Sequence, residues 1–485
     1  MVEGICRCLV AEVCSFTTYV LKVRTMKTVY VKDLLRGSKR EGAAVELLCW
    51  VKARRNLGQL VFLDLCDSTG TIQAITKDAR VLEPPSSETT FESEESLKAE
   101  KTAQGTFSTA KTLSLESSVK ATGIMQQSPK GFEIYLTSLD IIGNATADFS
   151  PRPRSNINVL DGKLADHLLR NRHLYIRNEK MMAILRFRHE VMGAIHTWFR
   201  QKGFTEITAP ILTAVPLYED RNAMSLEVSG EHIFLTQCVG FYLESAVHAF
   251  EKVYNIGPSF RAEETHSKRH LMEYWHIKGE LAWVNLDDLF SIVEDLIGDV
   301  VQFCIDECDD LVKTLGTKLC VHGLATPFPH ISYVDAAQRL QHLGIPFEFG
   351  TSMGSAEEEV LSKQFASPFW ITGIPRKVEP FPYVIDKDDR RVTRTADLIA
   401  SNGYGELLGI AEKTADLAEI DERMAEKGKA DDPRYDWVRQ LREFGCVPHG
   451  GFGIGVERLI RWLLDIPHVR DTIPFPRTFR RKIAP

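Results

Sequence analysis

A charged stretch between residues 256 and 283 carries side chains that could bind a nucleotide. Its pattern predicts a strand, a polar loop and a returning strand. An arginine guanidinium can hold a phosphate with two hydrogen bonds, and a tyrosine ring can stack on a purine base. A charged surface hairpin is the alternative that this stretch alone leaves open. The side chains concerned are Arg261, Glu263, Arg269, His270 and Tyr274.

A second segment, GGFGIGVERLIRWLL at residues 450–464, makes a nucleotide site the better interpretation. It predicts a glycine-rich strand that runs into an amphipathic helix, whose apolar face begins at Leu459 and Ile460. Glycines let the backbone approach a ligand closely. Arg458 follows the last glycine by three residues, so it supplies a second cation for a polyphosphate.

Length and composition limit the class of protein that positions these groups. A chain of 485 residues with 26% charged and 44% hydrophobic side chains predicts a soluble protein of two or three domains. The net charge of −7 does not suggest nucleic-acid binding over the whole surface, although local basic patches can still bind RNA. The ten cysteines contain no CxxC pair, so reduced thiols are expected.

The first 25 residues contain an apolar stretch, LVAEVCSFTTYVLKV, which could be a membrane span or a targeting segment. Glu12 interrupts the stretch, and it is too short to span a membrane. We therefore expect no membrane association and a cytoplasmic location. A weak targeting segment stays open as an alternative.

Residues 28–145 predict a small β-barrel. Runs such as VELLCWVKARR and TIQAITKD are separated by turn signals and give about five strands, the number that a barrel of the OB type requires. Between these strands, residues 82–110 are rich in Ser, Thr and Glu and predict a disordered insertion. Residues 1–27 and 146–178 would form an N-terminal extension and a linker.

Residues 179–485 predict a larger domain of the α+β class. Helical periodicity over residues 179–202 ends at Gly203, and a strand that contains Pro210 follows. Strands and helices then alternate, which favours an antiparallel sheet flanked by helices. No GxGxxG or GxxxxGK[ST] pattern occurs, so the sequence supports neither a dinucleotide-binding fold nor a P-loop.

The two charged segments together resemble motifs 2 and 3 of class II aminoacyl-tRNA synthetases. The forms FRAE…RH…EY and GFGIGVERL are similar to the aspartyl/asparaginyl subgroup. The helix, strand and proline near residue 210 resemble motif 1, which builds the dimer interface of the class. The barrel resembles the anticodon-binding domain of the subgroup. This resemblance implies a homodimeric ligase that activates an amino acid with ATP and Mg²⁺ and transfers it to tRNA.

The resemblance also implies roles in adenylate formation, in which the amino-acid carboxylate attacks the α-phosphorus of ATP. Such a step needs positioning and charge neutralisation more than a protein base. Arg261 would clamp the α-phosphate and the carboxylate, Arg458 would bind the far phosphates, and Glu406 would complete the catalytic set. Glu406 and Glu263 would hold Mg²⁺, which takes one or two carboxylates besides phosphate oxygens. The remaining ATP contacts would come from Arg269, His270 and Tyr274.

Residues 234–250, FLTQCVGFYLESAVHAF, resemble the strand and helix that bind the amino acid in the subgroup. Aspartyl members carry a Lys there to pair with the substrate carboxylate. Glu244 would instead repel aspartate and accept a hydrogen bond from an asparagine amide, unless it is an exposed helix residue. The implied amino-acid-binding residues are Gln237, Gly240, Glu244, Lys413 and, from a preceding loop, Asp220.

Two of these positions depart from the subgroup pattern. Gly240 replaces a Gln that helps to hold the α-ammonium group, and Lys413 replaces an Arg that reads the substrate side chain. Lysine does not reproduce a bidentate arginine contact. We expect an asparagine–tRNA ligase. The alternatives are an aspartyl or non-discriminating ligase, a paralogue that uses the adenylate with a non-tRNA acceptor, and a non-catalytic RNA-binding homologue.

The barrel also carries two residues to which the resemblance assigns contacts with an anticodon base. Phe62, in VFLDL, would stack on the base, and Gln73, in TIQAI, would form a hydrogen bond with it. A place in the strand core is the alternative for Phe62.

Overall fold

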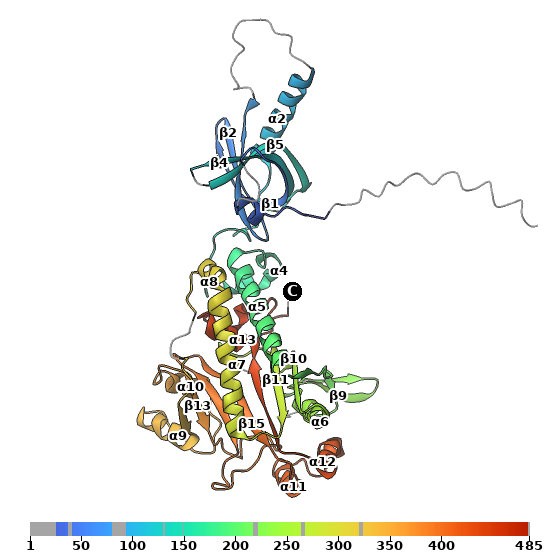
Figure 1. The fold of residues 1–485 in the computed structure, drawn as a ribbon, viewed down its shortest axis with the longest axis vertical. Coiled ribbons are helices and arrows are strands. Elements are labelled where there is room, and N and C mark those ends of the chain that lie inside the picture. Colours follow the sequence, from blue (N-terminus) through green and yellow to red (C-terminus); the bar gives the residue numbers. More distant parts are fainter. Residues whose placement is uncertain are drawn as a thin grey trace, which may run out of the picture. The chain divides into compact units, whose positions relative to one another are not determined.

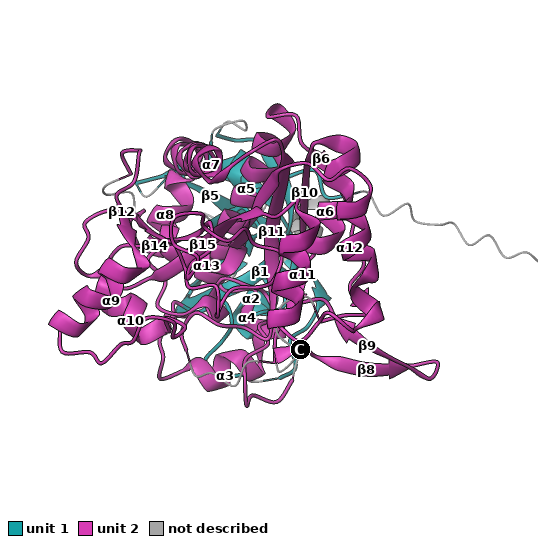
Figure 2. Ribbon diagram, turned by 90° about the horizontal axis from the view of Figure 1, so that it is seen from below, with its two compact units in different colours: residues 1–155 teal, residues 156–485 magenta. Residues whose placement is uncertain are grey.

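A computed structural model of the chain divides into two compact units, residues 1–155 and 156–485, which are described one at a time (Figures 1 and 2). Asp220, Glu263, residues 1–25 and the first part of the predicted insertion, 82–93, lie outside the described residues. The structure describes residues 26–36, 41–79, 94–129, 131–147, 149–216, 222–262, 267–319 and 324–483.

The first unit is built on a closed β-barrel with the strand order β1-β2-β3-β5-β4. Neighbouring strands are antiparallel except for the parallel pair β3 and β5. Side chains alternate along a strand, so Val61, Leu63 and Leu65 point into the core. The elements are α1 (Val31–Leu35), β1 (Ala44–Leu57), β2 (Leu60–Asp67), β3 (Gly70–Lys77), α2 (Glu94–Thr112), β4 (Ser118–Ser128) and β5 (Gly131–Gly143).

Helix α2 lies where the sequence predicts disorder, so the prediction of a disordered insertion is wrong for residues 94–110. Phe107, Ala110 and Leu113 recur every three residues and are buried in the barrel core. One apolar face is enough to hold a helix against the barrel. The Ser, Thr and charged residues that dominate the segment's composition conceal this face from a compositional argument.

The second unit is built on a sheet with the order β12-β13-β14-β15-β16-β11-β10-β6. Its neighbouring strands are antiparallel except for β12 with β13 and β6 with β10, which confirms the predicted α+β fold. The strands are β6 (Thr205–Glu206), β10 (Lys252–Phe260), β11 (Glu273–Ala282), β12 (His330–Ser332), β13 (Phe369–Thr372), β14 (Thr395–Ala400), β15 (Gly405–Lys413) and β16 (His449–Gly455).

Helices cover this sheet, and the two longest, α5 and α7, lie side by side (Figure 1). Helix α7 buries Leu289, Val293 and Leu296 at helical spacing and contacts β15 and β16. The helices are α3 (Ala165–Arg170), α4 (Arg172–Tyr175), α5 (Glu179–Gln201), α6 (Gly240–Phe250), α7 (Leu286–Glu307), α8 (Asp309–Leu315), α9 (Tyr333–His342), α10 (Ser355–Ser362), α11 (Leu417–Glu426), α12 (Asp436–Glu443) and α13 (Val456–Leu463), with short 3₁₀ turns at Pro433–Tyr435 and Val469–Asp471.

The predicted strand around Pro210 is divided in two. Its first part is β6, and its second part is β7 (Leu212–Thr213), which joins a separate small sheet with β8 (Ser225–Val228) and β9 (Glu231–Leu235). Proline has no N–H group to donate, so it suits the break between two strands better than the interior of one.

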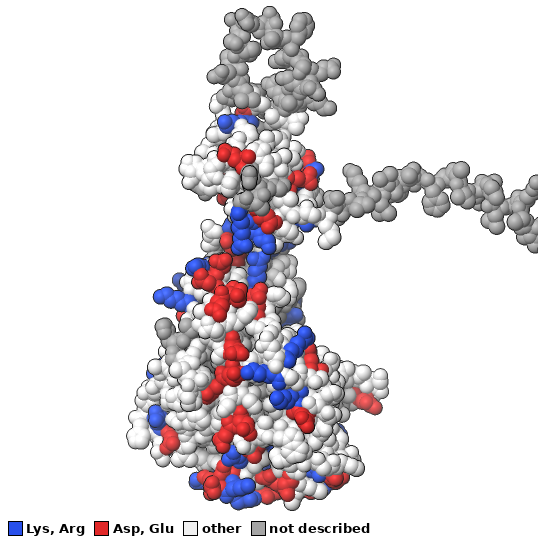
Figure 3. Space-filling model, in the orientation of Figure 1, with Lys and Arg blue, Asp and Glu red and all other residues white. Residues whose placement is uncertain are grey.

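Basic and acidic side chains are intermixed on the face drawn in Figure 3. This agrees with the modest net charge of −7 and places the ionic chemistry in particular sites rather than over a broad surface. Among the residues that the structure describes, no helix is long and apolar enough to cross a membrane.

Candidate active site

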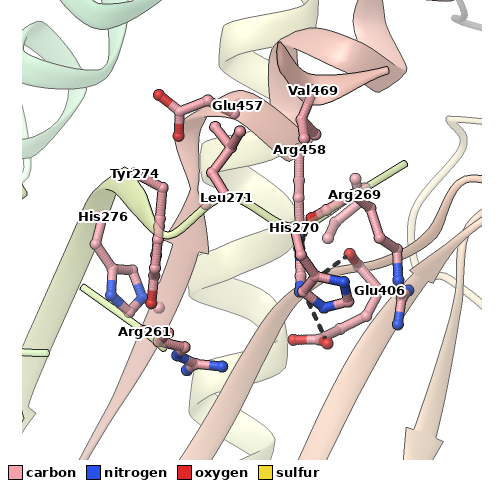
Figure 4. A pocket seen from close by; sticks show the side chains of 13 residues that line it. Arg261, Arg269, His270, Leu271, Tyr274, His276, Glu406, Glu457, Arg458 and Val469 are labelled. Carbon is pink, nitrogen blue, oxygen red and sulfur yellow. Dashed lines mark hydrogen bonds and ion pairs between the residues drawn. The ribbon is translucent and has the colours of Figure 1, made fainter. Parts of the chain in front are cut away.

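One pocket of the second unit gathers the predicted ATP-binding residues from three regions that are distant in sequence (Figure 4). The loop between β10 and β11, strand β11 itself, the start of β15 and the first turn of α13 supply them. The predicted residues in its lining are Arg261, Arg269, His270, Tyr274, Glu406 and Arg458.

The hairpin of β10 and β11 places Arg261 beside Tyr274. The strands pair in register from Lys252 to Phe260, and the Arg261 N–H then donates to the Met272 carbonyl at 2.9 Å. The guanidinium carbon lies 5.8 Å from the centre of the Tyr274 ring, within the range of a cation–π contact. The cation predicted to bind a phosphate and a flat aromatic surface therefore lie next to each other.

Arg458 links the helix α13 to the opposite wall of the pocket. Its Nη1 lies 2.9 Å from Oε2 of Glu406, and its Nη2 lies 3.3 Å from Nε2 of His270 (Figure 4). Burial and the Arg458 charge lower the pKa of His270 to about 3, so its ring is neutral at physiological pH. Burial opposes ionisation of Glu406, but Arg458 and Arg269 outweigh it and lower its pKa to about 2.

Arg269 is held from behind the pocket by Glu358, a residue on α10 that sequence reasoning missed. Nη2 of Arg269 donates to Oε1 of Glu358 at 2.8 Å, and its Nη1 makes a second close contact. Glu358 also accepts the backbone N–H of Glu406 at 2.7 Å. This buried carboxylate therefore orients two pocket residues at once. The acidic run AEEE on α10 gives no sign of which glutamate does so.

Asp397, on β14 next to β15, is a further acidic residue that the sequence analysis missed. Burial, followed by the neighbouring charges of Glu406 and Glu379, raises its pKa well above its ordinary value. Gly409 leaves it room, because a Cβ there would lie 2.9 Å from the Asp397 carboxylate. Asp397 is a half-buried carboxyl group that its surroundings and the neighbouring carboxylates keep from ionising, and a divalent cation would relieve this repulsion.

Polar side chains at alternate positions of β11 lead away from this pocket. Alternation in a strand sends them to the same face of the sheet. The glycines of β16 stand opposite them, and a Cβ at Gly453 would lie only 2.6 Å from Nζ of Lys278. The glycines of β16 therefore have a physical reason, because they leave space for the long side chains of β11. The β11 residues concerned are Tyr274, His276, Lys278 and Glu280.

At the far end of this line lies a buried charge cluster, which we call the Glu244 cluster: Glu244, Glu280, Lys413, Arg442 and His449. Glu244 forms a close ion pair with Arg442. Its carboxylate also lies 3.7 Å from Nζ of Lys413 and 3.2 Å from Nε2 of His449. Lys413 reaches Glu280 at 2.8 Å. Because Glu244 is fully buried, the alternative of an exposed helix residue is excluded.

Two members of the cluster, Glu244 and His449, stay ionised despite their burial. Burial opposes the charge of Glu244, yet Arg442 and Lys413 hold its pKa below its ordinary value. Burial also opposes the charge of His449, but Cys446 and Glu244 raise its pKa to about 9. The contacts of Glu244 with Arg442, His449 and Lys413 are ion pairs rather than aligned hydrogen bonds, and Oε1 of Glu280 also lacks an aligned donor in the described structure. The cluster thus contains buried carboxylate oxygens whose capacity to accept hydrogen bonds is not fully used.

The other predicted amino-acid residues lie at the start of α6. Gly240 is the first residue of α6, one helical turn before Glu244. Gln237 is buried, and its carbonyl accepts a hydrogen bond from the Tyr274 hydroxyl at 3.4 Å. This contact connects the turn between β9 and α6 to the wall of the predicted ATP pocket.

In the first unit, Phe62 and Gln73 share the outer face of the barrel. Phe62 is half-buried and is not among the core residues, so a place in the strand core is excluded. Arg55 links the two residues, because its guanidinium lies 5.8 Å from the Phe62 ring and donates to Gln73 Oε1 at 2.9 Å. Gln73 in turn donates to Glu133 at 3.0 Å. The face combines an aromatic ring with polar groups that can contact a base.

Comparison with known families matches both units. Residues 165–479 match the family model of class II tRNA synthetases (D, K and N), and residues 45–142 match that of the OB-fold nucleic acid binding domain. The synthetase match begins inside the segment predicted as a linker, at residue 165.

Individual relatives agree with these matches. The chain is 34% identical to the asparagine–tRNA ligase of Pyrococcus abyssi over 90% of this chain and 95% of the relative. It is also 34% identical to that of Thermococcus kodakarensis over 93% of this chain and 98% of the relative.

A solved structure of asparaginyl-tRNA synthetase from Pyrococcus horikoshii with asparaginyl-adenylate resembles the chain with a TM-score of 0.82 and 32% identity, over 95% of this chain and 100% of that chain. The corresponding enzyme of Entamoeba histolytica gives 0.76 and 25% identity, over 92% of this chain and 98% of that chain. The chain therefore belongs to the class II tRNA synthetases of the D, K and N group, as its two charged motifs predict.

Proposed function

We propose that the protein is an asparagine–tRNA ligase. The asparagine carboxylate attacks the α-phosphorus of ATP, which forms asparaginyl-adenylate and releases pyrophosphate. The 3′-hydroxyl of the terminal ribose of tRNA(Asn) then attacks the activated carbonyl and releases AMP. The relatives that carry this activity and the solved adenylate complex support the proposal.

The buried acceptors of the Glu244 cluster are the observation that carries the choice of asparagine. An asparagine side-chain amide offers two N–H donors, and Glu244 keeps two carboxylate oxygens without aligned donors. Aspartate would bring a third carboxylate against Glu244 and Glu280, which costs several kcal/mol in a buried site. Lys413 is the cation available to bind the amide oxygen.

In the ATP pocket, Arg261 would neutralise the α-phosphate and hold the substrate carboxylate in line with it. Arg458 would bind the far phosphates after exchanging its ion pair with Glu406 for a phosphate contact. Tyr274 would stack on adenine, while Arg269 and His270 close the pocket. Glu358 keeps this arrangement in place by fixing Arg269 and the backbone of Glu406. Positioning and charge neutralisation of this kind are the main contributions that phosphoryl chemistry asks of a protein.

Glu406 and Asp397 are the residues that fit a Mg²⁺ ion, and Glu263 remains a third candidate. The raised pKa of Asp397, caused by burial and by Glu406, supports this choice because a cation would relieve the repulsion between the two carboxylates. When bound, Mg²⁺ supplies charge neutralisation for the triphosphate.

We further propose that the outer barrel face around Phe62 and Gln73 binds the anticodon of tRNA. We also propose that the protein is a cytoplasmic homodimer whose interface includes the segment around Pro210. The exposed apolar side chains of Ile211 and Leu212 in that segment support the dimer.

Activation of aspartate is the second candidate, and the cations of the Glu244 cluster favour it. The carboxylates of Glu244 and Glu280 are surrounded by three cations, so one positive charge is in excess. The cations are Lys413, Arg442 and His449. That excess could bind a substrate carboxylate if Arg442 turned from Glu244 to the ligand.

Aminoacylation of tRNA(Asn) and tRNA(Asp) transcripts with each amino acid tests the proposal. We expect asparaginyl-tRNA(Asn) as the main product. Aspartyl-tRNA as the main product would favour the second candidate, and formation of a product from adenylate and an amine without tRNA would favour a paralogue with another acceptor.

A further inference from the structure

A group of metal-ligating side chains lies next to Glu244, at the end of α6 and in the turn before β16. His248, Cys446 and His449 each offer one ligand atom, and these atoms lie within 4.8 Å of one another. Within the described parts of the chain, no other three His, Cys, Asp or Glu side chains form such a group. The ATP and amino-acid chemistry proposed above leaves the Cys446 thiol and the His248 ring without a task.

The hydrogen bonds of His248 direct one ring nitrogen to Cys446. Its Nδ1 lies 2.7 Å from the carbonyl oxygen of Glu244, and a carbonyl can only accept, so Nδ1 carries the proton. The lone pair of Nε2 then faces Sγ of Cys446 at 3.2 Å. The thiol donates its proton to this nitrogen, and a metal ion could take the place of that proton.

His449 approaches the same thiol from the other side. Its Nδ1 lies 4.0 Å from Sγ of Cys446 and 2.7 Å from the Val447 carbonyl, to which it donates. Its Nε2 lies 3.2 Å from Oε1 of Glu244. A carboxylate behind a ligand imidazole is the usual partner of a metal-bound histidine, because it fixes the ring and strengthens its basicity.

Both histidines therefore place one nitrogen near an oxygen of the same residue, Glu244. The other nitrogen of His248 faces Cys446, and that of His449 lies 4.0 Å from the same thiol while it donates to the Val447 carbonyl. This second layer of contacts is what a ligand histidine requires and what a chance grouping on the surface lacks. Ligand atoms bound to one tetrahedral zinc ion lie roughly 3.3 to 3.7 Å apart. Small side-chain rotations would therefore bring the three atoms to the required spacing.

We propose that His248, Cys446 and His449 form a site for a divalent cation of the Zn²⁺ type. One thiolate and two imidazoles are ligands that suit zinc. Bonds form from the metal to Sγ, to Nε2 of His248 and to Nδ1 of His449. The S–H proton of Cys446 and the Nδ1 proton of His449 leave to solvent, so His449 exchanges its hydrogen bond to the Val447 carbonyl for the metal bond. The fourth position opens toward a surface cavity that His248 and Val447 line, which also gives the ion a route into the site.

The site would join α6 to the segment that enters β16. Since both histidines contact Glu244, a bound ion would fix the orientation of the acid at the centre of the Glu244 cluster. The ion is thus a structural support of the amino-acid pocket and takes no part in the reaction.

Metal binding to the full-length protein tests this site with Zn²⁺ and Co²⁺ as probes. We expect one Zn²⁺ per chain to remain after gel filtration and to raise the melting temperature. Bound Co²⁺ should show the absorption of a tetrahedral site and a thiolate-to-cobalt band. Wild-type protein that retains no Zn²⁺ would overturn the proposal.

Variants identify the ligands in the same experiment. Cys446→Ser should remove the thiolate-to-cobalt band and weaken Co²⁺ binding by more than about 10-fold, since even loss of an outer partner costs that much. Cys304→Ser, in a buried thiol of α7, and the double substitution of Cys6 and Cys8 to Ser should leave both unchanged. An unchanged cobalt spectrum in folded Cys446→Ser would contradict the assignment. If that variant does not fold, His248→Gln must weaken binding in the same way, and unaltered binding would overturn the site.

Discussion

The ATP pocket and the Glu244 cluster are neighbouring parts of one site that hold their charges in opposite ways. Arg261, Arg458 and Glu406 face an open cavity, where a bound nucleotide can exchange contacts with them. The Glu244 cluster is closed, and its ion pairs are buried between α6, α12 and the sheet. In the proposed function, the open side would bind a mobile polyphosphate. The closed side would bind the amino acid, and its selectivity would depend on which buried charges already have partners.

The largest expected effect tests the closed side. Arg442→Met removes the cation that pairs most closely with Glu244, and the carboxylate of Glu244 stays fully buried. We expect a loss of about 3–5 kcal/mol in the free energy of unfolding. Urea unfolding followed by circular dichroism measures it. Arg439→Met on the same helix is the matched control, because its pair with Asp421 is partly exposed and should contribute about 0–1 kcal/mol. Equal losses in the two variants would show that the cluster is not a special support of the fold.

The next effect tests the open side. Arg458→Ala removes a cation that faces the triphosphate, and we expect ATP–pyrophosphate exchange to fall by about 10²–10³-fold or more. Because the arginine lines a cavity, the unfolding transition should move little. Exchange at the wild-type rate in a folded variant would remove Arg458 from the ATP site.

A smaller effect separates substrate choice from stability. Glu244→Gln keeps the size of the side chain but removes its charge, so the repulsion that excludes aspartate should weaken. We expect the ratio of asparagine to aspartate exchange to fall by about 10-fold or more, on the scale of 1.4 kcal/mol per tenfold change. A ratio equal to that of the wild type would take Glu244 out of the specificity role.

The smallest expected effect concerns protonation in the ATP pocket. Burial and Arg458 lower the pKa of His270 to about 3, so the ring stays neutral as the pH falls from about 8 to about 6. The pH profile of exchange in His270→Asn should therefore run parallel to that of the wild type over this range, whatever its absolute rate. A wild-type inflection near pH 6.5 that the variant lacks would show that His270 titrates there.

The sequence analysis named more of the side chains that line the open pocket than of those that form the Glu244 cluster, and the reason is distance along the chain. One hairpin, β10 and β11, carries Arg261, His270 and Tyr274. Arg458 follows the glycines of β16, the strand that pairs with β11. Patterns within short segments therefore indicate which residues line the pocket. Arg269 finds its partner 89 residues away in Glu358, a pairing that no local pattern signals.

Other residues that the sequence analysis did not name also depend on contacts between segments that are distant in sequence. Arg442 and Asp397 gain their importance only when β14, α12 and α6 come together, so the sequence analysis did not name them. Helix α2 was missed because Phe107 and Ala110 are a small minority in a polar segment, while burial depends on the face that they share. The alternation of Tyr274, His276, Lys278 and Glu280 was a signal that could have identified the connection between the two sides.

ATP–pyrophosphate exchange with asparagine and with aspartate, each with and without tRNA, tests the central claim most directly. The account predicts exchange that needs no tRNA and that asparagine supports at least about 10-fold better than aspartate. A preference for aspartate would show that the cations of the Glu244 cluster, rather than its carboxylates, decide the substrate. Absence of exchange with both amino acids would contradict the proposal that this ATP pocket forms an adenylate.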